Sequence, residues 1–296
     1  MSKTIYLRVK GGLGNQLFQY AVAYYLKREF HRDVCIDISY YQLNKLLNNQ
    51  KRKFDIRNYQ LDKFNIESHK TQSNILCLGI DRIVRKFKQG GWTGRSVGIC
   101  ISEDNTTVRE DHRRSFKILQ EYSDKDCIVE GYWQNINYIS PYADDLRKQI
   151  RLNISYPDKV RKWSSLIHEC NSVGVHVRRG DFVKLGWDKG AEYYLNGMQY
   201  FVSKYPDIHF FLFSDDPDWC KDYLMIENMC SVVHMNNKDG DLYEFELLKS
   251  CKHQIISEST FGWWAAFLNE NPEKEIYVPK TVKGDIWLKE WTRGEL

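Results

Sequence analysis

Short apolar strands alternate with helices throughout the C-terminal half of the sequence, and this pattern restricts the fold more than any other feature. The expected strands cover residues 173–177, 209–213, 231–235, 254–257 and 275–278. The expected helices cover residues 192–205, 219–224, 241–252 and 260–269. Strands that are apolar along their length are typical of a parallel sheet with helices on both faces. We therefore predict a doubly wound parallel sheet.

The N-terminal part contains a second, less complete unit of the same kind. A strand at 4–9 leads through a glycine-rich turn to a helix at 17–30 and a strand at 34–38. Residues 41–126 show little pattern beyond one expected helix at 74–88 and a turn at Gly90-Gly91. A strand at 127–132 and a helix at 141–150 follow. We predict an α/β fold of two Rossmann-like domains facing a cleft, residues 1–155 and 156–296.

Composition excludes several other classes of protein. The formal net charge of +4 is too small for a surface that binds nucleic acid. The eight cysteines are scattered and form no C-x-x-C pair, which argues against a zinc ribbon or a redox motif. No signal peptide or spanning apolar segment is recognisable. We expect a cytoplasmic protein and leave open a peripheral contact with the inner face of a membrane.

The segment Gly174–Asp181 carries the sharpest local signal. Arg178 and Arg179 follow a buried strand, at the edge where open parallel sheets bind their ligands. Their guanidinium groups match phosphate geometry and stay charged at any working pH. The alternative is a structural ion pair between either arginine and Asp181.

Two further strands also end in polar residues. Ser214, Asp215 and Asp216 follow the strand at 209–213, where a carboxylate can accept hydrogen bonds from a ribose or a base. We assign Asp216, before Pro217, mainly to capping a helix. Ser259 and Thr260 begin a helix whose free N–H groups favour an anion, and either residue could equally be a plain N-cap.

The glycine-rich turn at Gly11–Leu17 allows a competing interpretation. Between a strand and a helix, and with Asp37 ending the next strand, it resembles the dinucleotide site of an NAD-dependent oxidoreductase. Leu17 replaces the third glycine of that motif, however, which weakens the match. A metal-dependent transferase is another alternative because Asp216-Pro217-Asp218 has the Asp-x-Asp form. Pro217 and the capping role of Asp216 argue against it, and we expect no metal.

Four segments together, in this order, resemble the α-1,2-fucosyltransferases of bacterial and blood-group-H type. They are Gly11–Ala21, His176–Asp181, Phe213–Asp216 and Ser259–Trp264. The resemblance implies a GT-B type fold and transfer of L-fucose from GDP-fucose, with inversion, to the 2-hydroxyl of a sugar acceptor. It implies no cofactor or metal, donor binding mainly by residues 156–296 and acceptor binding largely by residues 1–155.

The same resemblance assigns roles to individual residues. Arg178, Arg179, Asp181 and Asn15 are the expected catalytic residues. The expected donor-binding residues are His176, Arg178, Arg179, Ser214, Asp215, Ser259, Thr260, Phe261, Gly12 and Gly14. Glu258 departs from the family pattern, which often has Asn there, so a side-chain role at this position stays open.

Several points stay open at the level of sequence. Asp181 is a candidate base for the acceptor hydroxyl, but a carboxylate bonded to an arginine is a weak base, and water is the alternative. The expected acceptor is a galactose-containing oligosaccharide or a lipid-linked glycan, with no nucleic acid as partner. A transferase of different linkage and a non-catalytic protein that binds a nucleotide sugar are the remaining alternatives.

Overall fold

The computed structural model describes residues 4–48, 57–67, 99–102, 127–282, 284 and 286–294. The expected helix at 74–88 and the turn at Gly90-Gly91 lie outside these residues. Contacts divide the chain into two units, Met1–Arg151 and Leu152–Leu296. The predicted boundary lay after residue 155.

The N-terminal unit contains a parallel sheet with strand order β2-β1-β4-β3. Its main helix, α1, is buried along the predicted face, which includes Leu17, Tyr20 and Tyr24. In chain order the elements are β1 (Ile5–Arg8), α1 (Leu13–Phe30), β2 (Val34–Asp37), α2 (Ser39–Asn48), η1 (Leu61–Lys63), β3 (Ile99–Ser102), β4 (Cys127–Glu130), η3 (Ile136–Tyr138), η4 (Ser140–Tyr142) and α5 (Ala143–Gln149).

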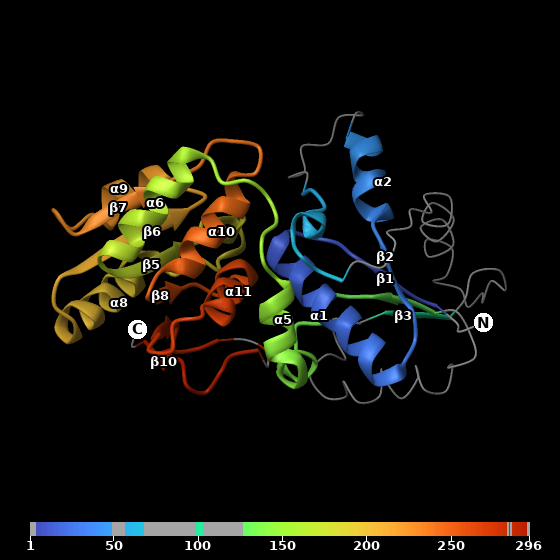
Figure 1. Cartoon of the computed structure of the whole chain (residues 1–296). Helices are drawn as coiled ribbons and strands as arrows, with labels where there is room; N and C mark the ends of the chain where they lie inside the picture. Colours follow the sequence, from blue (N-terminus) through green and yellow to red (C-terminus); the bar gives the residue numbers. More distant parts are fainter. Residues whose placement is uncertain are drawn as a thin grey trace. The chain divides into compact units, whose positions relative to one another are not determined.

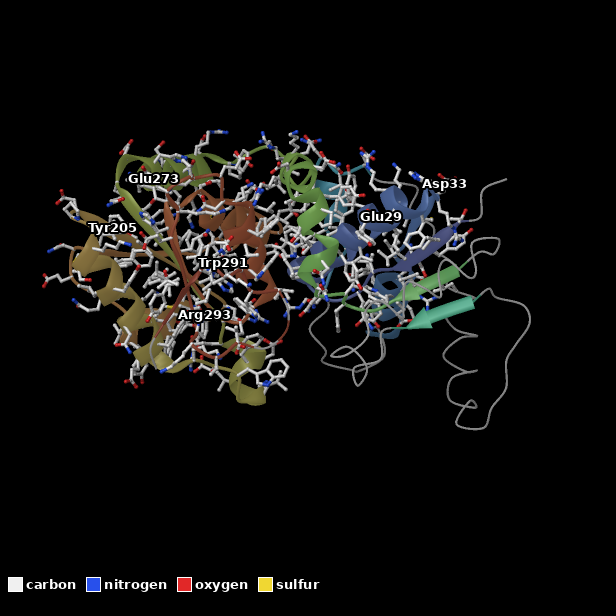
Figure 2. All side chains as sticks on the ribbon, turned by 90° about the horizontal axis from the view of Figure 1, so that it is seen from below. Glu29, Asp33, Tyr205, Glu273, Trp291 and Arg293 are labelled. Carbon is white, nitrogen blue, oxygen red and sulfur yellow. The ribbon has the colours of Figure 1, made fainter. Side chains whose placement is uncertain are left out.

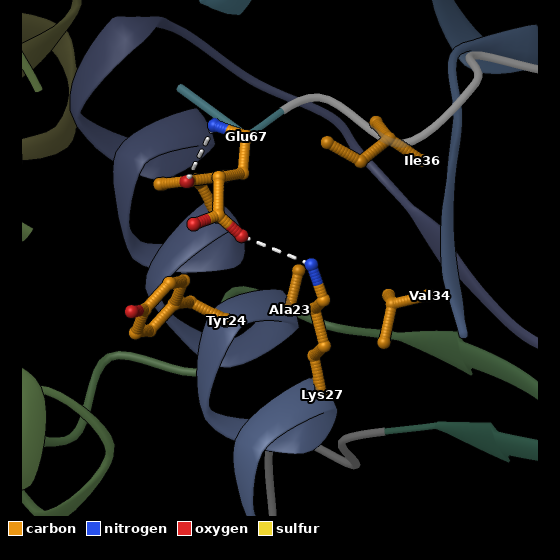
Figure 3. Close-up of a pocket in the computed structure, with 7 residues that line it drawn as sticks. Ala23, Tyr24, Lys27, Val34, Ile36 and Glu67 are labelled. Carbon is orange, nitrogen blue, oxygen red and sulfur yellow. Dashed lines mark hydrogen bonds and ion pairs between the residues drawn. The ribbon is translucent and has the colours of Figure 1, made fainter. Parts of the chain in front are cut away.

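Helix α1 begins four residues earlier than the sequence predicted, at Leu13 instead of Leu17. Gly11 makes the turn with φ of +87°, a left-handed conformation that side chains other than glycine disfavour. Gly12 is the N-cap, so Gly14 and Asn15 belong to the first turn of the helix. Between α1 and β2 lies a small cavity of about 10 Å³, room for about one water molecule. Lys27 and Glu67 form an ion pair at this cavity (Figure 3).

The C-terminal unit is the predicted doubly wound sheet. Its order is β10-β9-β8-β5-β6-β7, and all five neighbouring pairs are parallel. The elements are α6 (Asp158–Glu169), β5 (Asn171–Val177), α7 (Gly180–Leu185), α8 (Gly190–Lys204), β6 (Ile208–Ser214), α9 (Pro217–Tyr223), β7 (Cys230–Val233), α10 (Gly240–Ser250), β8 (His253–Ile256), α11 (Thr260–Leu268), β9 (Ile276–Val278) and β10 (Thr292–Arg293) (Figure 1).

Alternate side chains of β5 show how both faces of this sheet are covered. Val173, Val175 and Val177 pack into one core with residues of α8, including Tyr194 and Phe201. Gly174 faces the other way, where an added Cβ would lie 2.7 Å from Leu248 of α10. This burial on both faces explains the continuous apolar strands. In Figure 2, Trp291 lies within this unit, in agreement with its exposed fraction of 4%.

Candidate functional site

The order of strands in the C-terminal unit places the predicted motifs at one edge of its sheet. From β5 the chain continues to β6 and β7, then crosses to β8 on the other side of β5. Such a reversal creates a binding position beyond the carboxyl ends of the two strands that flank it, here β5 and β8. Arg178 follows β5, Asp215 follows β6, and Ser259 follows β8. The three C-terminal motifs therefore end at the same edge.

Arg178 lies between two carboxylates. Its Nη2 is 2.6 Å from Asp181 Oδ1, and its Nη1 is 2.6 Å from Asp215 Oδ2. The ion pair with Asp181 that we considered as a structural alternative is therefore present. The side chain of Arg178 is 20% exposed, and that of Asp181 is 51% exposed. Arg178 is thus held in place while remaining accessible from solvent.

Arg179 is held more completely, by contacts on several sides. Its Nε is 3.1 Å from Asp216 Oδ2 and its Nη1 is 2.9 Å from Asp188 Oδ2. Its guanidinium carbon lies 4.0 Å from the centroid of the Trp219 ring, within the range of a cation–π contact. Arg179 therefore connects the loop before α8 to the start of α9. The two adjacent arginines therefore differ in their surroundings.

The turn after β6 is organised by hydrogen bonds to its own backbone. Asp216 Oδ1 accepts the N–H of Trp219 at 3.3 Å, so the predicted capping role of Asp216 is confirmed. Ser214 is buried, and its Oγ accepts the N–H of Asp216 at 3.0 Å. Asp215 Oδ1 accepts the backbone N–H of Arg179 at 2.9 Å. Asp215 therefore joins the ends of β5 and β6.

The turn between β8 and α11 leads into a helix start, where backbone N–H groups have no partner within the helix. Ser259 is the N-cap of α11, and its Oγ accepts the N–H of Phe261 at 3.3 Å. Thr260 is the first residue of the helix, where N–H groups and the helix dipole favour an anion. Glu258, the residue that departs from the family pattern, forms an ion pair with Lys189, the N-cap of α8.

His176 is packed tightly beneath this turn. Its ring stacks on that of Phe261, with centroids 5.3 Å apart and an interplanar angle of 23°. A Cβ added to Gly262 would lie 2.8 Å from His176 Nδ1, so glycine is required for this approach. Burial, together with the charge of Arg178, lowers the pKa of His176 to about 3. The imidazole is therefore neutral at physiological pH.

The cluster contains more acidic than basic groups. The carboxylates of Asp181, Asp188, Asp215 and Asp216 pair with the guanidinium groups of Arg178 and Arg179, which leaves a formal charge of −2. An incoming diphosphate therefore has to compete with carboxylates for these donors. Asp188 was missed at the level of sequence because only the fold brings it to Arg179.

The glycine turn of the N-terminal unit is closed by internal hydrogen bonds. The carbonyl of Gly11 accepts from Gln16 Nε2 at 3.1 Å and from the Tyr41 hydroxyl at 2.9 Å. Asn15 Oδ1 accepts from Gln134 Nε2 at 3.0 Å. Gly12 is the N-cap of α1 and Gly14 lies in its first turn, and an added Cβ on Gly12 would meet Arg57 at 3.9 Å. Gly12 thus leaves room beside the helix start.

The aspartates on which the oxidoreductase and the metal-dependent transferase interpretations depend are paired with other residues. Asp37, the ribose ligand expected of an oxidoreductase, is buried and accepts from Arg8 Nε at 3.0 Å and from the Ser39 N–H at 2.9 Å. Asp218, half of the Asp-x-Asp pattern, pairs with Lys221 on the surface, and its side chain is 85% exposed. Within the described ranges, no cluster of three or more metal-ligating side chains occurs.

An opening of about 440 Å³ lies at the β7 end of the same edge. It is bounded by α6 and α9, which contribute Trp163 and Pro217, and by His234 after β7. Lys159 of α6 donates to the carbonyl of His234 at 2.9 Å across one side of this opening.

The family model described as Glycosyl transferase family 11 matches residues 4–293. The chain belongs to this family. The resemblance predicted from the four motifs is therefore confirmed, and the chain is a glycosyltransferase.

Curated relatives agree with this assignment, and a solved structure agrees with the fold. An alpha-1,2-colitosyltransferase of Escherichia coli is 29% identical over 88% of this chain and 86% of its own length. The O-antigen biosynthesis glycosyltransferase WbnK, also from Escherichia coli, is 23% identical over 93% and 94%. The fucosyltransferase NodZ from Bradyrhizobium matches with a TM-score of 0.53, at 15% identity, over 90% of this chain and 91% of that one. The predicted fold class is confirmed. Among the described helices, none is long and apolar enough to cross a membrane.

Proposed function

We propose that this glycosyltransferase moves L-fucose from GDP-fucose to the 2-hydroxyl of a terminal β-galactoside, with inversion and without a metal ion. The observation that supports this most is Arg178 at the strand reversal, oriented by Asp181 and Asp215 and still accessible. Its charge replaces that of a metal ion beside the leaving diphosphate. Relatives named as galactoside α-(1,2)-fucosyltransferases support the linkage.

The mechanism follows from where charge develops. In the transition state the sugar becomes oxocarbenium-like while negative charge grows on the diphosphate. Donors fixed at that position stabilise the transition state more than the ground state. Arg178, the Ser259 hydroxyl and the N–H groups at the start of α11 are the proposed donors, with Arg179 holding the surrounding loops. Asp181, half-exposed beside Arg178, or a water molecule accepts the proton of the acceptor hydroxyl.

The acceptor is proposed from the relatives. WbnK is named for O-antigen biosynthesis, which supports a galactose-containing oligosaccharide or a lipid-linked glycan as acceptor. We propose a cytoplasmic location, with peripheral membrane contact if the acceptor is lipid-linked. Recovery of the enzyme with or without membranes after cell fractionation tests this.

A second donor is favoured by one specific observation. The relative matched over 88% of this chain is named a colitosyltransferase, and colitose is fucose without its 3-hydroxyl. The same edge of the sheet could serve either GDP-sugar, because the groups that bind GDP are the same. Competition between GDP-fucose and GDP-colitose for one acceptor decides between them.

The test is release of GDP from each donor in the presence of EDTA, against a panel of β-galactosides and a blank without acceptor. Release that requires a galactoside supports a metal-independent transferase, and methylation analysis of the product gives the linkage. Loss of activity in EDTA would overturn the metal-independent mechanism. Binding of GDP-fucose without transfer to any acceptor would favour a binding protein.

A further inference from the structure

Glu244 of α10 is a mostly buried carboxylate that the mechanism above does not use. Its Oε1 accepts the backbone N–H of Met235 at 2.8 Å and lies 3.3 Å from His234 Nδ1. Both partners follow β7, so the carboxylate lies at the carboxyl end of that strand. Its side chain is only 15% exposed. A carboxylate in such a position is costly unless it is paired or binds a ligand.

The second oxygen of Glu244 is available to a ligand. Within the part of the chain that the structure describes, no group donates a hydrogen bond to Oε2, and this atom is not enclosed. Lys159 acts on Glu244 through its charge, but its Nζ donates to the carbonyl of His234. Glu244 therefore has a free acceptor atom and no hydrogen-bonded lysine or arginine.

Burial raises the pKa of Glu244 to about 7. The negative charges of Asp241 on its own helix and of Asp215 after β6 act in the same direction. The Met235 N–H bond and Lys159 of α6 oppose them, and His234 is the remaining titratable group beside it. The group is thus close to half-protonated near neutral pH. Donors that approach Oε2 shift it to the ionised form.

The position of Glu244 along the sheet edge matches one end of a nucleotide. The turn at Ser259 follows β8, Arg178 follows β5 and Asp215 follows β6, while Glu244 lies beside the end of β7. Three strand spacings separate β8 from β7, about 14 Å. A nucleoside diphosphate laid across this edge, with its phosphates at β5 and β8, brings its base to β6 and β7.

We infer that Glu244 recognises the guanine base, with Oε2 accepting the N1–H and 2-amino hydrogens of its Watson–Crick edge. Guanine presents two adjacent donors there, whereas adenine presents an unprotonated ring nitrogen that a carboxylate repels. This inference rests on the proposed GDP-sugar donor. It assigns base selectivity to a residue outside the motifs on which the resemblance rests.

The inference couples donor binding to a proton. The free enzyme carries a proton on Glu244 below about pH 7, and the complex does not. Affinity for the GDP-sugar therefore rises with pH up to about 7 and is constant above it, and binding below that pH releases close to one proton. A GDP-sugar is the suitable ligand because its diphosphate is esterified at both ends and does not titrate in this range.

The experiment is calorimetric titration of the full chain with GDP-fucose at about pH 6.5, in buffers of different ionisation enthalpy. Binding of GDP and of inosine diphosphate, which lacks the 2-amino group, is measured in parallel. Wild type should release about 0.8 proton, because a group with a pKa of about 7 is about three-quarters protonated at this pH. It should prefer GDP by about 10–100-fold, the effect of one hydrogen bond to a charged group. Glu244→Gln should release none and lose most of this preference.

The matched control is Glu246→Gln, because Glu246 lies on the same helix and pairs with Lys249 at 2.7 Å. It should behave as wild type. Proton release and guanine preference that survive in Glu244→Gln would overturn the inference and point to another group, such as His234. If that variant does not fold, wild type alone decides, since equal binding of GDP and inosine diphosphate by wild type also overturns it. Failure of wild type to bind any guanine nucleotide would instead refute the proposed function.

Discussion

The two units contain the same kind of parallel sheet but use the polar residues at their strand ends differently. After β1 and β2, the polar groups satisfy one another: Gln16 and Tyr41 hold the Gly11 carbonyl, and Arg8 holds Asp37. After β5, β6 and β8, charged groups pair at a partly exposed edge, and α11 begins there with N–H groups that have no partner within the helix. A polar strand end therefore indicates a binding site only where some of its charged groups stay accessible to a ligand.

The largest expected effect is a loss of kcat on substitution of Arg178 at the edge of the C-terminal sheet. Arg178→Ala removes the accessible guanidinium and should lower kcat by about 10–100-fold or more, because one charge-assisted hydrogen bond to the leaving group is lost. Steady-state GDP release measures this, with thermal unfolding as a check on the fold. Arg161→Ala is the control, since Arg161 pairs with Asp158 on the surface and is 64% exposed. An unchanged rate for Arg178→Ala would contradict the role of this edge.

Substitution of one glycine in each unit, Gly262 and Gly11, compares how the two turns affect stability and GDP binding. Gly262→Ala forces a Cβ against buried His176 and should lower the free energy of unfolding by about 1–3 kcal/mol while weakening GDP binding. Gly11→Ala strains a turn at φ of +87° and should cost about 1–2 kcal/mol with a smaller effect on GDP binding. Urea denaturation and GDP titration of both variants test this. Equal losses of affinity would remove the distinction.

Lowering the pH should have a smaller, reversible effect on the free energy of unfolding. His176 has a pKa of about 3 in the folded protein and about 6.5 when unfolded, so only the unfolded state binds a proton between these values. Its contribution lowers stability as pH falls below about 6.5, by at most about 1.4 kcal/mol per pH unit. His176→Gln should reduce the slope of unfolding free energy against pH. An unchanged slope for His176→Gln would contradict the burial argument.

The smallest expected effect concerns the N-terminal turn. Asn15→Ala removes a neutral hydrogen-bonding group and should lower kcat by about 2–10-fold, less than Arg178→Ala. Gln134→Ala is the informative companion because it frees Asn15 Oδ1 from its partner. Product formation at saturating donor measures both. A loss for Asn15→Ala larger than that for Arg178→Ala would shift the catalytic centre toward the glycine turn.

The sequence predicted five of the six strands of the C-terminal sheet, because those strands are short, mostly apolar and bounded by polar residues. Strand β10 was missed because it consists of only two polar residues, Thr292 and Arg293. Helix α6 was missed although Val160 and Ile167 form its buried side, since most of its other residues are polar. The start of α1 was placed too late because Gly14 was counted with the turn, whereas one glycine at positive φ, Gly11, is enough to make it.

The site was predictable only in part, for a similar reason. Motifs at strand ends could be placed on a common edge because parallel strands end together. The partners of those motifs could not be predicted. Asp188 pairs with Arg179, and Lys189 with Glu258, only because the loop before α8 folds back to this edge. Glu244 carried no local signal either, as its burial depends on how α10 packs beside β7.

The most direct test of the central claim is amide hydrogen exchange of the protein with and without GDP. The account predicts slower exchange at the ends of β5, β6 and β8, in residues 178–190, 214–219 and 257–262. It predicts smaller changes around Gly11–Gln16. Protection confined to the glycine turn, with none at these three segments, would contradict the assignment of nucleotide binding to the C-terminal unit.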